Sequence, residues 1–216
     1  MEFKNIINLI ILDASGSMES IYNQALSGVN ETIQSIRKSQ KDYPSLLQYL
    51  TLASFNSGKN YLNIKYQKTP IDEVNEITKE DYVADGCTAL YDAMGEMISG
   101  LKRNVTQEDR VLVTVVTDGY ENSSVHWSGP QIKSLVEELR HEGWTFAYIG
   151  ANQDVEAVAG SMGIRNTLTF DADEEGVEVM RRVSVSARSK FMKKLEDARM
   201  FGHACLEEPT DYFAEK

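Results

Sequence analysis

The strongest constraint on the fold is an apolar run near the N-terminus. Six of the seven residues from 6 to 12 are apolar, and the run ends on the carboxylate of Asp13. A near-continuous apolar run of this length is typical of a parallel strand that is covered on both faces. Such a strand requires a layer of helices on each side of its sheet. The run therefore predicts an α/β fold, and it raises the question of why a buried strand ends on an acid.

The rest of the chain alternates between the two patterns that this fold requires. Apolar spacings of three and four predict helices at 18–38, 88–102, 129–143, 155–163 and 174–198. Strand-like segments occur at 5–12, 46–55, 61–67, 110–116, 144–150 and 166–170. This order predicts a Rossmann-like, doubly wound and mostly parallel six-stranded sheet with helices on both faces.

One predicted strand differs from the others. Apolar and polar side chains alternate strictly in 61–67, which is typical of a strand with one solvated face. We therefore expect this strand to lie antiparallel at an edge of the sheet, after a hairpin loop at 56–60. We assign residues 1–198 to one domain and residues 199–216 to a polar C-terminal tail.

The composition disfavours several classes of partner. The 216 residues carry a net charge of −11, which opposes binding to phosphate backbones and to anionic membrane surfaces. No apolar run reaches the roughly 20 residues of a membrane span, and the first run lacks the features of a signal peptide. The two cysteines show neither metal-ligand spacing nor a disulfide framework. We therefore expect a cytoplasmic protein that binds no nucleic acid and inserts into no membrane.

Oxygen-bearing side chains occur in three loops at the ends of predicted elements. Asp13, Ser15 and Ser17 follow the first strand, Thr88 begins a helix, and Asp118 ends the fourth strand. Doubly wound sheets bind ligands at the carboxyl ends of strands, where the strand order reverses; the common order would bring the two acids face to face. Carboxylates and hydroxyls suit a hard cation, Mg²⁺ or Mn²⁺, with Ca²⁺ a weaker candidate. The first strand would then end on an acid because that acid belongs to a metal site.

Each of these residues also has an ordinary structural interpretation. Ser17 and Thr88 could cap the helices that they precede, and Asp118 with Gly119 could form a turn. Capping and turn formation explain single residues, whereas a metal site explains five residues in three loops together. We therefore favour the metal site.

Several polar neighbours of the three loops allow two roles each. Asp85 is either a turn residue or an acid that supports the site, and Asp92 either orients the metal loops or lies on a solvated helix face. Glu121 and Asn122 line the rim of the site or are ordinary loop residues. His126 is a surface residue unless it acts as a base for one of the serines.

The three loops together resemble the metal-ion-dependent adhesion site of von Willebrand factor type A (vWA) domains. The family's D-x-S-x-S motif matches Asp13, Ser15 and Ser17, its threonine matches Thr88, and its later aspartate matches Asp118. The resemblance covers about residues 5–198. It implies a six-stranded sheet with one antiparallel edge strand, in a compact, single-domain, intracellular member of bacterial type.

The resemblance also implies a function. In such a domain the ion bridges to an Asp or Glu of a partner protein, so we expect a protein-binding module rather than an enzyme. In relatives, a change in the loop that carries the later aspartate is coupled to sliding of the last helix, here 174–198.

A metal-dependent phosphatase or phosphotransferase of Rossmann-like type is the alternative. Such enzymes also place an Asp at the end of the first strand, and those of the haloacid dehalogenase type use a second Asp two positions later as acid and base. Here that position is Ser15, which cannot protonate a leaving group at neutral pH. We therefore prefer the binding module.

Overall fold

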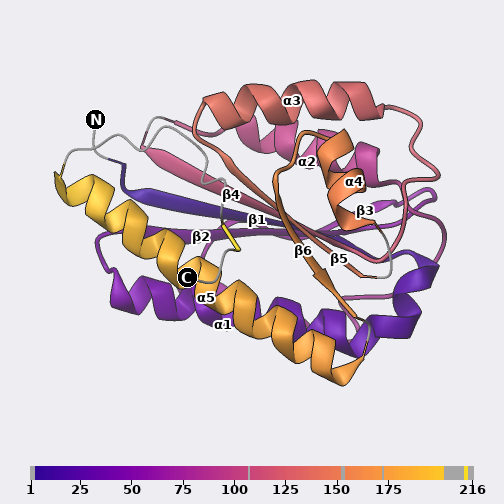
Figure 1. Cartoon of the computed structure of the whole chain (residues 1–216), viewed down its shortest axis with the longest axis horizontal. Helices are drawn as coiled ribbons and strands as arrows, with labels where there is room; N and C mark the ends of the chain where they lie inside the picture. Colours follow the sequence, from indigo (N-terminus) through magenta and orange to yellow (C-terminus); the bar gives the residue numbers. More distant parts are fainter. Residues whose placement is uncertain (1–2, 107, 152–153, 172, 202–211, 214–216) are drawn as a thin grey trace.

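Six strands form one sheet at the centre of the molecule (Figure 1). The computed structural model describes the chain except for residues 1–2, 107, 152–153, 172, 202–211 and 214–216. The strands are β1 (Asn5–Asp13), β2 (Leu47–Phe55), β3 (Leu62–Pro70), β4 (Asp109–Thr117), β5 (Thr145–Ala151) and β6 (Asn166–Phe170). Their order is β3-β2-β1-β4-β5-β6, with β3 antiparallel to β2 and the other described pairs parallel. The predicted fold class and the antiparallel edge strand are confirmed.

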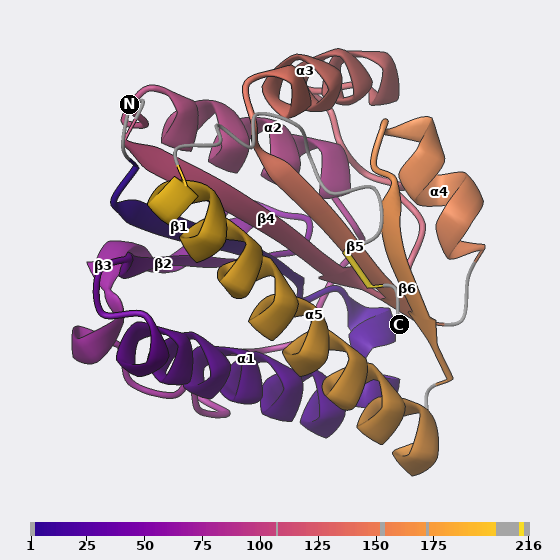
Figure 2. The ribbon, with the colours of Figure 1, turned by 60° about the vertical axis from the view of Figure 1, so that its left-hand side comes forward.

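Helices cover both faces of the sheet. They are α1 (Tyr22–Asp42), α2 (Leu90–Lys102), α3 (Gly129–His141), α4 (Val155–Ser161) and α5 (Glu174–Phe201), with short 3₁₀ helices η1 (Gly16–Ile21) and η2 (Ile71–Glu73). Figure 2 shows α1 and α5 on one face of the sheet and α2, α3 and α4 on the other. None of the helices in the described part of the chain combines the length and the apolar character that crossing a membrane requires.

The central strand β1 is apolar on both faces because both faces are covered. Ile7, Leu9 and Ile11 pack in the core on the side of α2 and α3. Ile10 and Leu12 pack in the core on the side of α1. Successive side chains of a strand point to opposite faces, so a strand between two helical layers needs apolar residues at nearly every position.

The structure differs from the sequence analysis mainly at the ends of helices. The helix predicted at 18–38 begins as η1 and becomes α-helical only at Tyr22. At the C-terminus, α5 continues to Phe201, beyond the predicted end at 198. The division of the chain at residue 198 stays a prediction, since most of 199–216 lies outside the described residues. Tyr212 nevertheless packs edge-on against the ring of Phe191 and is 7% exposed.

Candidate metal site

The candidate site lies where the neighbouring parallel strands β1 and β4 end. These strands pair in register as far as Leu12 and Val116. Each strand ends one residue later, at Asp13 and Thr117. The strand that follows β1 in the chain, β2, lies on one side of this pair, and the strand that follows β4, β5, lies on the other. The strand order therefore reverses between β1 and β4. Side chains at a point of reversal are not covered by a crossover helix and remain open to a ligand.

Asp13 is held rigidly at the base of the site. Its side chain is 0% exposed, Oδ1 accepts from the backbone N–H of Ser15 at 2.7 Å, and Oδ2 accepts from the hydroxyl of Thr117 at 2.6 Å. The buried hydroxyl of Tyr82 donates to the backbone carbonyl of Asp13 at 2.8 Å. These contacts fix both the carboxylate and the backbone that carries it.

A chain of hydrogen bonds joins the two serines to the second acid. The hydroxyls of Ser15 and Ser17 lie 3.1 Å apart, and the Ser17 hydroxyl donates to Oδ1 of Asp118 at 2.7 Å. Ser15 is buried, Asp118 is half-buried and Ser17 is exposed. The predicted residues from the first and third loops are therefore in direct contact.

Gly119 marks the point on which the three loops converge. A Cβ atom at this position would lie 3.2 Å from Oγ1 of Thr88, 3.4 Å from Oγ of Ser17 and 3.9 Å from Oδ2 of Asp13. Side chains from three distant segments thus surround one small volume, and glycine leaves that volume free of a side chain. The structure brings all five predicted residues together here.

The electrostatics of the site favour a cation. Burial raises the pKa of Asp13 above its ordinary value, and the nearby charge of Asp118 raises it further, against the hydrogen bonds that lower it. Burial likewise raises the pKa of Asp118. Two carboxylates that are poorly solvated and repel each other are stabilised by a positive charge between them. The donor set of two carboxylates and three hydroxyls fits a hard divalent cation.

The site contains more hydroxyl groups than side chains of His, Cys, Asp or Glu, which are the usual metal ligands. No cluster of three or more His, Cys, Asp or Glu side chains suited to a metal occurs in the part of the chain that the structure describes. A cation bound between Asp13 and Asp118 would therefore depend on Ser15, Ser17 and Thr88 for its remaining protein ligands.

The capping interpretation of Ser17 and Thr88 does not hold. Ser17 lies inside η1, whose N-cap is Ser15, and the N-cap of α2 is Ala89; neither cap forms a side-chain hydrogen bond. The hydroxyls of Ser17 and Thr88 face the site instead.

Asp92 does not lie on a solvated helix face. It is buried in the first turn of α2, and its carboxylate accepts from the backbone N–H groups of Val125, His126 and Trp127. These three bonds hold the loop that follows Asp118 against α2. Of the two roles that the sequence allowed, Asp92 has the orienting one.

Glu121 and Asn122 join the second and third loops. Oδ1 of Asn122 accepts from the backbone N–H of Thr88 at 2.9 Å, and the backbone N–H of Asn122 donates to the carbonyl of Thr88 at 3.1 Å. Glu121 accepts from the backbone N–H of Tyr91 at 2.9 Å. Both residues therefore position Thr88 relative to Asp118 and do more than line a rim.

The sequence analysis did not identify Thr117 or Tyr82 as residues of the site, although both contact Asp13. Thr117 directly precedes Asp118, so its place beside a candidate ligand was the available signal. Tyr82 lies in an irregular segment without periodicity, and nothing in the sequence connects it to Asp13 across 69 positions. Asp85 accepts from the N–H of Gly86, as a turn residue does.

Comparison with solved structures shows the same fold. Proximal thread matrix protein 1 from the mussel byssus, described with a zinc-occupied MIDAS motif, has a TM-score of 0.58 and 16% identity over 85% of this chain and 45% of that one. The pilus adhesin SpaC from Lactobacillus rhamnosus GG has a TM-score of 0.64 and 17% identity over 90% and 31%. The SpRpn10 VWA domain has a TM-score of 0.57 and 10% identity over 83% and 94%.

The chain spans less than half the length of the first of these proteins and matches most of the SpRpn10 domain. No curated protein sequence shows significant similarity to it. A family model described as von Willebrand factor type A domain matches residues 9–181, from the middle of β1 into α5. Because this match covers most of the sequence and contains all three loops of the site, the chain belongs to the von Willebrand factor type A domain family.

Proposed function

We propose that the protein is a metal-dependent protein-binding module and not an enzyme. Asp13, Ser15, Ser17, Thr88 and Asp118 would hold one Mg²⁺ or Mn²⁺ ion, directly or through waters, with Ca²⁺ a weaker candidate. The observation that carries this proposal is the convergence of side-chain oxygens from three segments on the volume beside Gly119. When bound, the ion would supply a positive centre to which an Asp or Glu of the partner protein binds.

The balance of ligands suits capture of a partner's carboxylate. Three of the five proposed ligands are neutral hydroxyls, which offset none of the charge of a divalent ion. The two acids are fixed by hydrogen bonds within the protein, Asp13 by Ser15 and Thr117 and Asp118 by Ser17. The two acids together carry two negative charges, so an incoming carboxylate would gain most where they face the ion through waters and less where they bind it directly.

Exposed apolar side chains on the same loops would contact the rest of the partner. Tyr120 and Val125 follow Asp118 in the loop between β4 and α3, and Val83 precedes Asp85; Val125 is 80% exposed. Protein interfaces bury apolar and aromatic side chains together with a smaller number of direct polar contacts. We therefore expect a partner that presents its acidic residue within an apolar surface.

The phosphatase alternative lacks an acid–base residue beside Asp13. The position two residues after Asp13 is Ser15, whose hydroxyl cannot protonate a leaving group at neutral pH and lies 3.1 Å from the hydroxyl of Ser17. The alternative role of His126, as a base for Ser15 or Ser17, also lacks a supporting contact among the described residues. The bond that places His126 comes from its backbone N–H, and its exposed ring has no hydrogen bond to Ser15 or Ser17 among the described residues.

The cytoplasm of a bacterial cell is the proposed location. Cys87 is an exposed free thiol in the loop that carries Thr88. An exposed thiol persists in a reducing compartment and is prone to oxidation outside it.

Calorimetric titration tests the metal site. The wild type should bind one Mg²⁺ or Mn²⁺ per chain, and Asp13→Ala should not; Ca²⁺ and Zn²⁺ are titrated in parallel. Asp85→Asn is the matched control, since Asp85 is an exposed acid of the neighbouring loop whose carboxylate accepts from the N–H of the next residue, Gly86, and it should bind like the wild type. The absence of binding to the wild type, or equal binding to Asp13→Ala, would contradict the proposal.

Capture from a cell extract with and without EDTA then tests the function. Partners that bind the wild type in Mg²⁺ but not in EDTA, and not Asp13→Ala, support the bridge. A partner that stays bound in EDTA would show that the ion does not hold it.

A further inference from the structure

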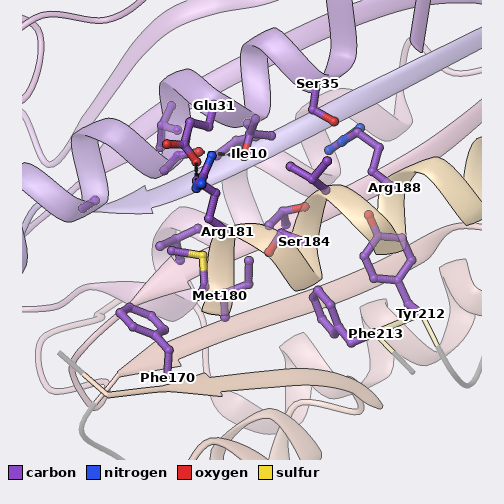
Figure 3. A pocket seen from close by; sticks show the side chains of 18 of the residues that line it. Ile10, Glu31, Ser35, Phe170, Met180, Arg181, Ser184, Arg188, Tyr212 and Phe213 are labelled. Atoms are coloured by element: carbon purple, nitrogen blue, oxygen red, sulfur yellow. Dashed lines mark hydrogen bonds and ion pairs between the residues drawn. The ribbon is translucent and has the colours of Figure 1, made fainter. Parts of the chain in front are cut away.

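A cavity lies between α1, α5 and the sheet, on the face away from α2. Its volume is about 50 Å³. Most of its wall is apolar and includes Ile10, Val29, Phe170 and Met180. Figure 3 shows that Ser184, Arg188 and Tyr212 also border it, with the Tyr212 hydroxyl directed toward Arg188. The cavity therefore combines an apolar wall with a group of hydrogen-bond donors.

Arg188 is a buried cation without an anionic partner in the described part of the chain. Its side chain is 4% exposed, and its one hydrogen bond there is from Nη1 to Oδ1 of Asn8, a neutral acceptor on β1. Burial lowers the pKa of the guanidinium. A guanidinium carries five N–H donors, and Arg188, which borders the cavity, uses one of them in a hydrogen bond to a described residue. Buried charges in proteins are normally paired, and Arg188 has no anionic partner among the described residues.

Arg181 is a second arginine that borders the cavity, and unlike Arg188 it has anionic partners among the described residues. It lies two turns earlier on α5 and also borders the cavity, but it forms ion pairs with Glu31 and Glu178. The carboxylate of Glu31, which also borders the cavity, is therefore paired with Arg181. Of the two arginines that border the cavity, only Arg181 has an anionic partner among the described residues.

Two further donors lie beside Arg188. The hydroxyl of Ser184, one helical turn before Arg188, is buried and has no hydrogen-bond partner among the described residues. The hydroxyl of Tyr212 has no hydrogen bond to any described residue, and burial raises its pKa, so it stays protonated. The backbone N–H of Tyr212 donates to Oδ1 of Asn166 at 3.1 Å, which holds this tyrosine in position. Three donors thus border the cavity, and the one carboxylate in its described lining, Glu31, is paired with Arg181.

We propose that this cavity binds a short-chain monocarboxylate, with its carboxylate on Arg188, Ser184 and Tyr212 and its alkyl chain against the apolar wall. A planar carboxylate matches the fork of a guanidinium. In this measure of volume one water needs roughly 10–15 Å³, so the cavity accommodates about four waters or an acid of similar size. Phosphate and sulfate fit less well, because they are more strongly hydrated and have no apolar part to meet the wall.

Butyrate is the probe, and binding is measured by calorimetry and by thermal shift in EDTA. EDTA removes the metal, so butyrate cannot bind at the candidate metal site. The wild type should bind butyrate, and butyramide, a neutral molecule of similar shape, should bind at least about tenfold more weakly. Arg188→Met should lose butyrate binding by a similar factor.

Controls separate this site from others and from a folding defect. Arg182→Met, at an exposed arginine of the same helix that does not border the cavity, should bind butyrate like the wild type. Arg188→Lys keeps the charge without the fork and should bind with intermediate affinity; it also replaces Arg188→Met if that variant does not fold. Asp13→Asn should bind butyrate normally even though it loses the metal, so the two proposals fail independently. No butyrate binding to the wild type, equal binding to the Arg188 variants, or tighter binding of inorganic phosphate would overturn the inference.

Discussion

Replacement of Asp13 by asparagine should stabilise the metal-free protein while abolishing metal binding. The carboxylate of Asp13 is fully buried beside a second acid, and its burial outweighs the hydrogen bonds that favour its charge. Asparagine keeps a carbonyl oxygen for the N–H of Ser15. Its NH₂ group can donate to the hydroxyl of Thr117, which can in turn donate to the carbonyl of Gly119, 3.3 Å away. The variant therefore removes the charge without leaving a buried group unpaired.

The expected gain follows from two opposing contributions. Burial of an ionised group costs several kcal/mol, here taken as about 4. Conversion of two charge-assisted hydrogen bonds to neutral ones loses about 1 kcal/mol each. The net gain of about 2 kcal/mol corresponds to a rise in Tm of roughly 4–8 °C for a domain of this size. Asp13→Ala should fold but be less stable than Asp13→Asn by about 2 kcal/mol, because the N–H of Ser15 loses its acceptor.

The assay is thermal unfolding of wild type and both variants, in EDTA and in excess Mg²⁺. In EDTA, Asp13→Asn should have a higher Tm than the wild type. With metal at a hundred times its dissociation constant, the wild type should gain about 2.7 kcal/mol and exceed the Asn variant, which should not respond. A variant Asp13→Asn that is less stable than the wild type in EDTA would refute the reasoning about the buried charge.

The pH dependence has a definite sign. The pKa of Asp13 is raised in the folded protein, so its ionisation destabilises the metal-free fold above the ordinary carboxyl pKa of 3.8. Below that value Asp13 is protonated in both the folded and the unfolded state, and this contribution disappears. The stability advantage of Asp13→Asn in EDTA should therefore shrink as the pH falls, which unfolding at a series of pH values measures.

Three other substitutions test how the loops are held. Thr88→Ala should abolish capture of the partner while leaving much of the metal affinity, which pull-down and calorimetry on the same variant decide; undiminished capture would count against the ion as bridge. Gly95→Ala should destabilise by about 1–3 kcal/mol and weaken metal binding, because its Cβ would lie 2.1 Å from the ring of Trp127 in the site loop; an unchanged Tm would show that Trp127 moves freely. Asp92→Ala should cost about 3 kcal/mol in unfolding free energy by leaving three backbone N–H groups without their acceptor, and a loss below about 1 kcal/mol would show that water replaces it.

The fold was largely predictable because its determinants are local. The apolar run of β1 and the helical spacings reflect burial by neighbouring layers, and the alternation in β3 reflects its half-exposed position at the sheet edge. Each pattern can be read within about ten to twenty residues. Helix ends were less predictable, since Ser17, within η1, contacts Asp118 in a loop about a hundred positions away. The five candidate ligands were found from loop position and residue type alone.

The amino-acid sequence by itself determined the layered sheet and the residue types at its open edge. Only the tertiary structure decided which of those residues meet and what holds them. Contacts between distant segments hold the site loop on Asp92, place Thr117 and Tyr82 on Asp13, and bury Arg188 against the neutral Asn8. Periodicity records which face of an element is buried, but the partner of a single buried polar group depends on strand order and helix packing. That information exists only once the chain has folded.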